Sequence, residues 1–208
     1  MCIKANAYKY NYGRQANKTL KDIELPDRVP KWVYSTSVKP VKTATKIQKL
    51  PVDTSGWCEF TLGELFTFHK GKRLTKEDMV DGTVNFIGAI SENNGVRQFI
   101  DVEPMYSPNC ITVNYNGSVG EAFYQHEPFW ASDDVNVLYA KNWELNKYIA
   151  MFVITTIKAN RYKFCYGRKW TLDKMKESII KLPQTAKGLP DWKYMERYIK
   201  SLPYSDRI

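Results

Sequence analysis

Short runs of alternating apolar and polar residues fill the stretch from residue 57 to residue 140, and turn-forming dipeptides separate them. Asn94-Gly95 and Asn116-Gly117 each lie between two such runs, which is a strong signal for a β-hairpin. The strands expected from this pattern are residues 84–90, 96–102, 110–114, 119–124, 129–131 and 135–139. This part of the chain therefore predicts a curved antiparallel sheet.

The residues between position 57 and the first of these strands carry mixed signals. Residues 62–66 fit either a short helical turn or the start of a strand, and residues 68–74 fit a basic loop broken by Gly71. Thr75 and Asp78 have the spacing of a capping box, which predicts a brief helical turn after that loop.

The hydrophobic period lengthens to three and four residues after position 141, which is typical of amphipathic helices. A first helix is expected from its N-cap Asn142, with an apolar stripe from Leu145 to Ile157. A second should follow the N-cap Thr171 and end before Pro183. Its inward residues would be Leu172, Met175 and Ile179.

A third helix is expected from about Asp191 to Lys200. Its apolar face would hold Trp192, Met195 and Ile199. The order of elements gives an α+β fold, in which a curved antiparallel sheet is followed by short helices.

A segment rich in cations and aromatic rings occurs twice. Residues 3–14 and 157–168 share nine identities in twelve positions, and similar residues continue at 20–26 and at 175–183. Internal repeats of this length indicate a tandem arrangement. Residues 1–33 are therefore expected to resemble the end of a preceding domain, and residues 34–56, rich in Ser, Thr, Pro and Lys, to form a linker.

The net charge of +9 is unevenly distributed along the 208 residues. Residues 1–56 carry +7, residues 57–140 carry −7 and residues 141–208 carry +9. Clustered positive charge suggests a polyanionic partner, although solvated surface lysines would give the same count. A DNA-binding face cannot be uniformly acidic, so Glu59, Glu64 and Asp78 are expected away from it.

Signatures of catalysis, metal binding and secretion are missing from the sequence. The four cysteines are widely spaced, and His69 and His126 lack the spacing of metal ligands. No phosphate-binding glycine motif, amino-methyltransferase tetrapeptide or nuclease motif occurs, and Asp133-Asp134 fits a strand cap better than a catalytic pair. No signal peptide or membrane span is apparent. We therefore expect a cytoplasmic protein that is not an enzyme and holds no metal or cofactor.

Three groups of residues suit contact with a phosphate backbone and base edges. The candidates are Lys70, Lys72 and Arg73 in the basic loop, Arg97 and Asn116 near the two hairpin turns, and Arg161, Tyr162, Lys163, Arg168 and Lys169 in the repeated segment. Asn116 fits a plain hairpin tip equally well, and the alternating aromatics Tyr162, Phe164 and Tyr166 fit a core strand.

Several of these residues occur within motifs that resemble those of a known family. The motifs, in order, are Trp57-x-x-Phe60-x-Leu62-Gly63-Glu64-Leu65-Phe66, Gly71-Lys72-Arg73-Leu74, Phe86-Ile87-Gly88-Ala89, Asn116-Gly117-Ser118-Val119-Gly120, Phe129-Trp130-Ala131-Ser132-Asp133-Asp134-Val135 and Tyr162-Lys163-Phe164-x-Tyr166-Gly167-Arg168-Lys169-Trp170-Thr171. Together they resemble a target recognition domain from specificity (S) subunits of type I restriction–modification systems.

The resemblance implies a target recognition domain at residues 57–185 and a short helical spacer and docking segment at residues 186–208. Such subunits read part of a double-stranded DNA site and direct a methyltransferase and nuclease to it, without catalysis of their own. Residues 191–200 form a shorter helix than many spacers of the family, which favours a short-spacer system. The chain would then be a half-subunit, with the homodimer as one assembly, or a fragment of a longer subunit.

The leading hypothesis is sequence-specific recognition of duplex DNA, with Trp192, Met195 and Ile199 docking a DNA methyltransferase subunit or a second copy of the chain. A restriction subunit is a further expected partner. Two alternatives remain open: a degenerate domain that only binds the methyltransferase, and a non-specific single-strand binder that uses stacked tyrosines. The sequence does not define the DNA site or the oligomeric state.

Overall fold

The computed structural model describes residues 50–75, 77–164 and 168–208. The chain divides into two compact units, Met1–Thr45 and Lys46–Ile208, and the second unit is the one described below. The front copy of the repeat and most of the expected linker lie outside the described residues, and so does Tyr166.

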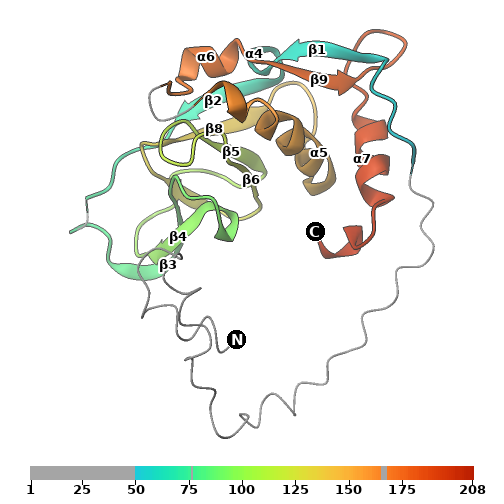
Figure 1. The fold of residues 1–208 in the computed structure, drawn as a ribbon. Coiled ribbons are helices and arrows are strands. Elements are labelled where there is room, and N and C mark those ends of the chain that lie inside the picture. The colour runs from blue at the N-terminus through green and yellow to red at the C-terminus, as the bar shows by residue number, and fades with distance from the viewer. Residues whose placement is uncertain (1–49, 76, 165–167) are drawn as a thin grey trace, which may run out of the picture. The chain divides into compact units, whose positions relative to one another are not determined.

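The described unit contains nine strands and four α-helices among its described residues (Figure 1). In chain order they are β1 (Trp57–Thr61), α4 (Leu62–Leu65), β2 (Phe66–Lys70), β3 (Asp81–Ile87), β4 (Val96–Ile100), β5 (Cys110–Asn114), β6 (Ala122–Gln125), β7 (Phe129–Ala131), β8 (Val135–Ala140), α5 (Lys147–Lys158), α6 (Leu172–Lys176), β9 (Ile179–Pro183) and α7 (Trp192–Lys200). Short 3-10 turns lie at Asn93–Gly95 (η3), Arg161–Lys163 (η4) and Ser205–Arg207 (η5).

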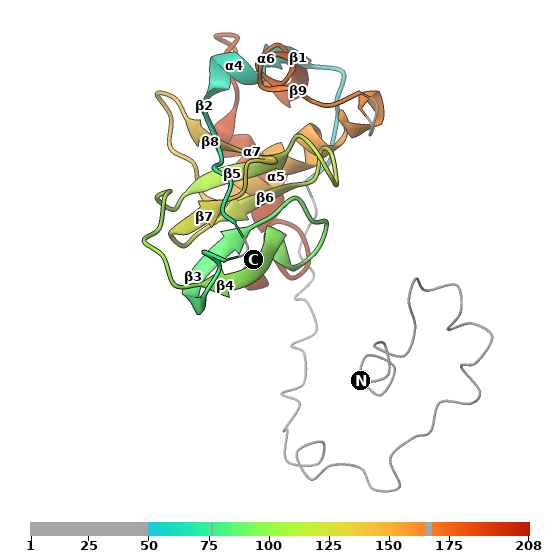
Figure 2. The same ribbon diagram turned by 90° about the vertical axis from the view of Figure 1, so that its left-hand side faces the viewer.

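The strands form three sheets, in the orders β2-β8-β5-β6, β4-β3-β7 and β1-β9. The predicted α+β class is confirmed, and both expected hairpins are present, β3 with β4 and β5 with β6. One pair departs from the antiparallel expectation, because β7 runs parallel to β3, beside which it lies (Figure 2).

The unit begins with a strand that the alternation pattern had not resolved. β1 pairs with β9 from Trp57 opposite Pro183 to Thr61 opposite Ile179. α4 follows directly, because Thr61 and Glu64 form a capping box: Glu64 accepts from Thr61 N at 2.8 Å, and Thr61 Oγ1 accepts from Glu64 N at 3.2 Å. At Thr75 and Asp78 the structure has a hydrogen-bonded turn in place of the expected helical turn.

Two helix predictions need correction. The N-cap of α5 is Asn146, whose side chain accepts from the backbone N–H groups of Tyr148 and Ile149 at 3.0 Å. Asn142 lies four residues earlier with φ 25°, in the turn that leaves β8, so it cannot cap the helix. α6 ends at Lys176, and Ile179 lies in β9 with 44% of its surface exposed, because the backbone here pairs with β1.

The main hydrophobic core lies between the four-stranded sheet and α5, with α7 packed on the other side of α5 (Figure 1). Met195 is fully buried and Ile199 is 7% exposed. Trp192 stacks on Trp143 with ring centroids 3.8 Å apart. The chain's own core therefore covers Met195 and Ile199 of the face predicted to dock a partner, while Trp192 is partly buried against Trp143.

A smaller core surrounds Phe129 and Cys110 beneath β3, β7 and β8. Burial raises the pKa of the Cys110 thiol to about 12, so this side chain is a neutral core residue at neutral pH. Within the described part of the chain, no helix combines the length and apolar character that crossing a bilayer requires.

Candidate nucleic-acid interface

Three loops leave the four-stranded sheet at the same end, which we call the loop end. β2 finishes at Lys70, opposite Asn136 near the start of β8, and β5 finishes at Asn114, opposite Val135. β6 starts beside them at Ala122. The loops that emerge here are residues 71–75, 115–121 and 132–134.

The turn between β3 and β4 joins this end of the sheet. Ser132 N donates to Ile87 O at 2.9 Å, and Ser118 N donates to Ala89 O at 3.3 Å. Gly117 has φ +70°, and a Cβ added there would lie 3.0 Å from both the Cβ and the carbonyl oxygen of Ala89. Glycine therefore allows the 115–121 loop to pack closely onto the turn.

The basic loop, residues 70–73, is held against this cluster. A Cβ at Gly71 would lie 2.0 Å from the carbonyl oxygen of Ser132, so no other residue fits without displacing the backbone. Lys70 Nζ lies 5.5 Å from the centre of the Tyr115 ring, in cation–π geometry. Lys72 and Arg73 are exposed, and their side chains have no partner among the described residues.

Arg97 lies next to the loop end, on the edge strand β4. Its side-chain methylene carbon Cδ would lie 3.1 Å from a Cβ at Gly88, so the chain of Arg97 runs along that glycine. Arg97 is exposed, and its guanidinium also has no partner among residues that the structure describes. The neighbouring outward residue of β4 is Phe99, which is 55% exposed.

The segment after α5 reaches the loop end through Gly120 and Glu121. A Cβ at Gly120, which has φ +80°, would lie 2.5 Å from the Cβ of Arg161. The Glu121 carboxylate pairs with Lys158 at 2.8 Å and with Arg161 at 2.5 Å. Because its guanidinium is already paired with an acid, Arg161 is less suited to phosphate contact than the sequence alone indicated.

The other predicted contacts of this segment differ in how they are held. Tyr162 is 79% exposed, which excludes the alternative of a core strand for this ring. Lys163 donates to Asn160 Oδ1 at 2.8 Å, and Arg168 donates to the carbonyl oxygen of Lys163 at 3.4 Å. No described contact ties the exposed Lys169 to the loop end. Phe164 and Trp170, in contrast, stack on each other and belong to the main core.

Asn116 has a structural partner of its own. Its side-chain amide donates to Asp134 Oδ1 at 2.8 Å, which joins the 115–121 loop to the 132–134 loop. The same amide retains a second N–H and its oxygen, so the hydrogen bond to Asp134 fixes the orientation of Asn116 without exhausting its capacity.

Two of the acidic residues expected away from DNA lie in β1 and α4, before the start of β2, whereas the basic loop lies at the other end of that strand. Glu64 is engaged in the α4 cap, which lowers its pKa through the hydrogen bond from the Thr61 backbone. Glu59 pairs with Lys181 across β1 and β9. Asp78 lies close to the basic loop instead, because its carboxylate accepts a hydrogen bond from Thr75, which is two residues after the end of that loop.

Residues 54–203 match the family described as the type I restriction modification DNA specificity domain. The chain belongs to this family. The match covers nearly the whole described unit, α7 included, which agrees with the packing of α7 into the core of the specificity domain.

Known relatives of the specificity domain come from restriction systems. The specificity subunit S.BcgI of the type II restriction enzyme BgcI from Heyndrickxia coagulans is 42% identical over 144 residues, which is 69% of this chain and 42% of that protein. The S subunit of a type I system from M. genitalium has a TM-score of 0.55 at 22% identity, covering 74% of this chain and 40% of that one. The HsdS subunit from Thermoanaerobacter tengcongensis has a TM-score of 0.51 at 14% identity, covering 76% and 38%.

The two solved structures show the same fold. The specificity domain described here spans less than half the length of each of these three relatives.

Three side chains that position the loop end of the specificity domain were not among the site residues predicted from the sequence. Glu121 binds two cations, while Tyr106 and Trp130 donate to carbonyl oxygens of the basic loop. Trp130 lies in the Phe-Trp-Ala-Ser-Asp-Asp motif, which was the one available signal. Glu121 and Tyr106 carry no sequence signal, because their partners are 40 and 36 residues away along the chain.

Proposed function

We propose that this specificity domain recognises a sequence in double-stranded DNA through its loop end, as part of the specificity subunit of a restriction–modification complex. The observation that carries the proposal is the gathering of loops from separate strands around exposed, unpaired cations. Lys72, Arg73 and Arg97 have no acidic partner among the described residues, so they are available to phosphate oxygens.

Base contacts would come from Asn116, whose orientation is fixed before DNA binds, and from the guanidinium of Arg97, which is unpaired among the described residues. Asn116, held by Asp134, presents an N–H and an oxygen that suit the edge of adenine, and Arg97 suits guanine. Four residues of the segment after α5 would contact the DNA phosphate backbone next to these bases: Tyr162, Lys163, Arg168 and Lys169. The chain itself would carry no catalytic group, and the methyltransferase and nuclease activities would belong to partner subunits.

The test is binding of the purified protein to a fluorescein-labelled 30-base-pair duplex, with selection from a randomised duplex pool to find the preferred site. The logarithm of the association constant should fall with the logarithm of salt concentration by about 0.9 for each phosphate contacted. Equal affinity for single strands and duplexes, or affinity that does not change with salt, would contradict duplex recognition. Methyltransferase binding without DNA binding would favour the interaction-only alternative.

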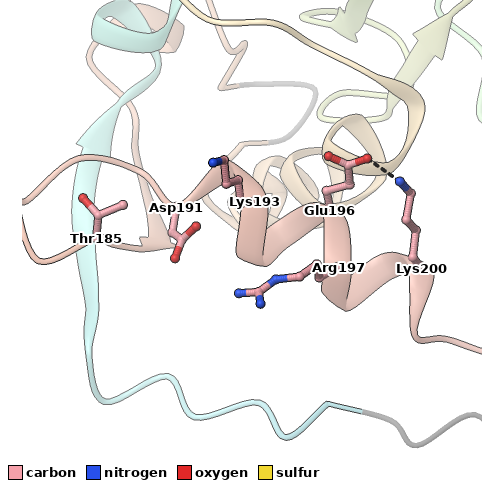
Figure 3. A pocket seen from close by; sticks show the side chains of 6 residues that line it. All are labelled: Thr185, Asp191, Lys193, Glu196, Arg197 and Lys200. Carbon is pink, nitrogen blue, oxygen red and sulfur yellow. Dashed lines mark hydrogen bonds and ion pairs between the residues drawn. The ribbon is translucent and has the colours of Figure 1, made fainter.

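We further propose that the exposed face of α7 docks the methyltransferase subunit, in place of the buried face considered from sequence. A surface pocket on this side of the helix is lined by Thr185, Asp191, Lys193, Glu196, Arg197 and Lys200 (Figure 3). Glu196 and Lys200 pair at 2.5 Å, whereas Lys193 and Arg197 have no ion-pair partner in the described part of the chain. Cations next to a concave surface suit an acidic segment of a partner.

Co-purification with the methyltransferase of the same system tests this docking surface. The double variant Lys193→Glu, Arg197→Glu should lose the methyltransferase and retain DNA binding. Lys174→Glu on α6 is the matched control, because it reverses an exposed charge on another helix. Loss of the methyltransferase in the control alone, or retention in the double variant, would place the docking surface elsewhere.

A further inference from the structure

The backbone of the basic loop is fixed on one side by the strands beside it. Gly71 N donates to Val135 O at 2.9 Å, and Lys72 N donates to Ala131 O at 2.9 Å. These two bonds extend the pairing of β2 beyond its last residue, and they bring the loop against the end of β7. The N–H groups of Gly71 and Lys72 are therefore satisfied by neighbouring strands.

Two side chains hold the carbonyl oxygens of the same residues. Tyr106 Oη donates to Lys70 O at 2.7 Å, and Trp130 Nε1 donates to Lys72 O at 3.0 Å. Hydrogen bonds therefore hold the backbone at the carbonyl groups of Lys70 and Lys72 and at the N–H groups of Gly71 and Lys72. Its conformation is determined before any ligand arrives.

Burial in the core does not account for the position of Trp130. Its neighbours in β7, Phe129 and Ala131, are fully buried, whereas Trp130 is only half-buried on the other side of the strand. What its indole N–H contacts is the loop carbonyl of Lys72. Tyr106 is likewise half-buried, and burial raises its pKa, so its hydroxyl remains a hydrogen-bond donor at neutral pH.

We propose that Trp130 and Tyr106 are positioning residues for DNA binding, which hold the basic loop so that Lys70, Lys72 and Arg73 are presented together. This inference rests on the proposed function of the loop end. A loop that is already ordered loses less conformational entropy when its cations bind phosphate, and DNA affinity is higher as a result. Removal of the hydrogen bonds that order the loop should therefore lower the affinity.

The variants Trp130→Phe and Tyr106→Phe test the inference, because each keeps an aromatic ring and removes one donor. Trp143→Phe and Tyr194→Phe are matched controls. Trp143 Nε1 donates to Leu65 O at 2.9 Å, and Tyr194 Oη donates to Pro51 O at 2.9 Å. Each control loses the same kind of side-chain to carbonyl hydrogen bond at a position away from the basic loop.

Binding is measured by fluorescence anisotropy with a 30-base-pair duplex of mixed sequence, from 50 to 200 mM salt. Trp130→Phe and Tyr106→Phe should each weaken binding about fivefold. They should also make the salt dependence shallower by about 0.9, the value for one phosphate contact. The controls should keep the affinity and the slope of the unchanged protein. A purely structural role for Trp130 would lower thermal stability and leave the slope unchanged.

Amide hydrogen exchange of the segment 66–75, measured without DNA, gives a readout that does not depend on DNA binding. Exchange at positions 71 and 72 should accelerate in Trp130→Phe and Tyr106→Phe and not in the controls. Unchanged exchange, or unchanged affinity and slope in a protein that binds duplex DNA, would overturn the inference. Faster exchange in the variants of a protein that binds no duplex would refute the proposed function, and the role in DNA binding would fall with it.

Discussion

Replacement of Met195 by alanine tests whether α7 belongs to the specificity domain itself. The Met195 side chain is fully buried in the main core, on the side where α7 packs against α5. If α7 were instead a separate spacer that waits for a partner, Met195 would face solvent in the isolated protein. The two arrangements predict different losses of stability.

The expected loss follows from what the substitution removes. Met195→Ala deletes three heavy atoms from a closely packed region, and truncation of a buried Met to Ala costs about 2–5 kcal/mol. Part of this is lost hydrophobic transfer, and the remainder is the cavity left when the surroundings relax incompletely. With a urea m-value of roughly 2 kcal/mol per molar, a loss of about 3 kcal/mol lowers the urea midpoint by about 1.5 M.

Urea unfolding followed by tryptophan fluorescence measures this change, with Lys193→Ala as the control on the exposed face of the same helix. The control should stay within about 0.5 kcal/mol of the unchanged protein, as exposed substitutions do. If Met195→Ala behaves like Lys193→Ala, the packing of α7 against α5 does not contribute to the stability of the unit, and the reasoning fails.

Other substitutions and reagents test the loop end and the smaller core. Glu121→Gln should release the cations Lys158 and Arg161 from their ion pairs. Anisotropy titrations should then show tighter non-specific duplex binding and a salt slope steeper by about 1–2. An unchanged slope would place these two cations outside the interface. Gly71→Ala should lower the melting temperature and weaken DNA binding. The clash of the new Cβ with Ser132 O should cost about 1–3 kcal/mol of folding stability. Unchanged values would show that the loop moves freely. Cys110 should resist iodoacetamide at pH 8 until urea unfolds the protein, as read by peptide mass mapping, because its raised pKa keeps the thiol neutral. The same shift means that the folded state loses stability as the pH rises above the ordinary thiol pKa towards 12, and early labelling of the native protein would contradict the burial.

The sequence predicted the local features of the fold well. Alternation and the Asn-Gly dipeptides identified both hairpins, and the three-four spacing identified α5 and α7, because these signals lie within a few residues of one another. The pairing of β1 with β9 was missed, since its partners are more than a hundred residues apart. The same distance explains Ile179, whose neighbours suggested a helix while β1 held it in a strand.

The sequence shows which residues are basic, but it carries no information on which of them are engaged. Arg161 and Arg97 look alike in the chain, yet Arg161 pairs with Glu121 and Arg97 has no partner among the described residues. Trp192, Met195 and Ile199 form an apolar stripe, and a stripe has the same spacing whether it packs inward or faces a partner. Such distinctions depend on contacts between distant segments.

The pairing of β1 with β9 has a consequence for how this domain could be carried by larger proteins. β1 therefore lies beside Pro183, and the two ends of the specificity domain meet again farther out, where Leu50 N donates to Ser201 Oγ, just after α7, at 3.4 Å. A segment whose two ends are neighbours can be spliced into a host polypeptide without forcing the host's flanking parts apart. Under the proposed function, exchange of this whole segment would replace the DNA preference of the complex in a single genetic step and leave its other domains unchanged.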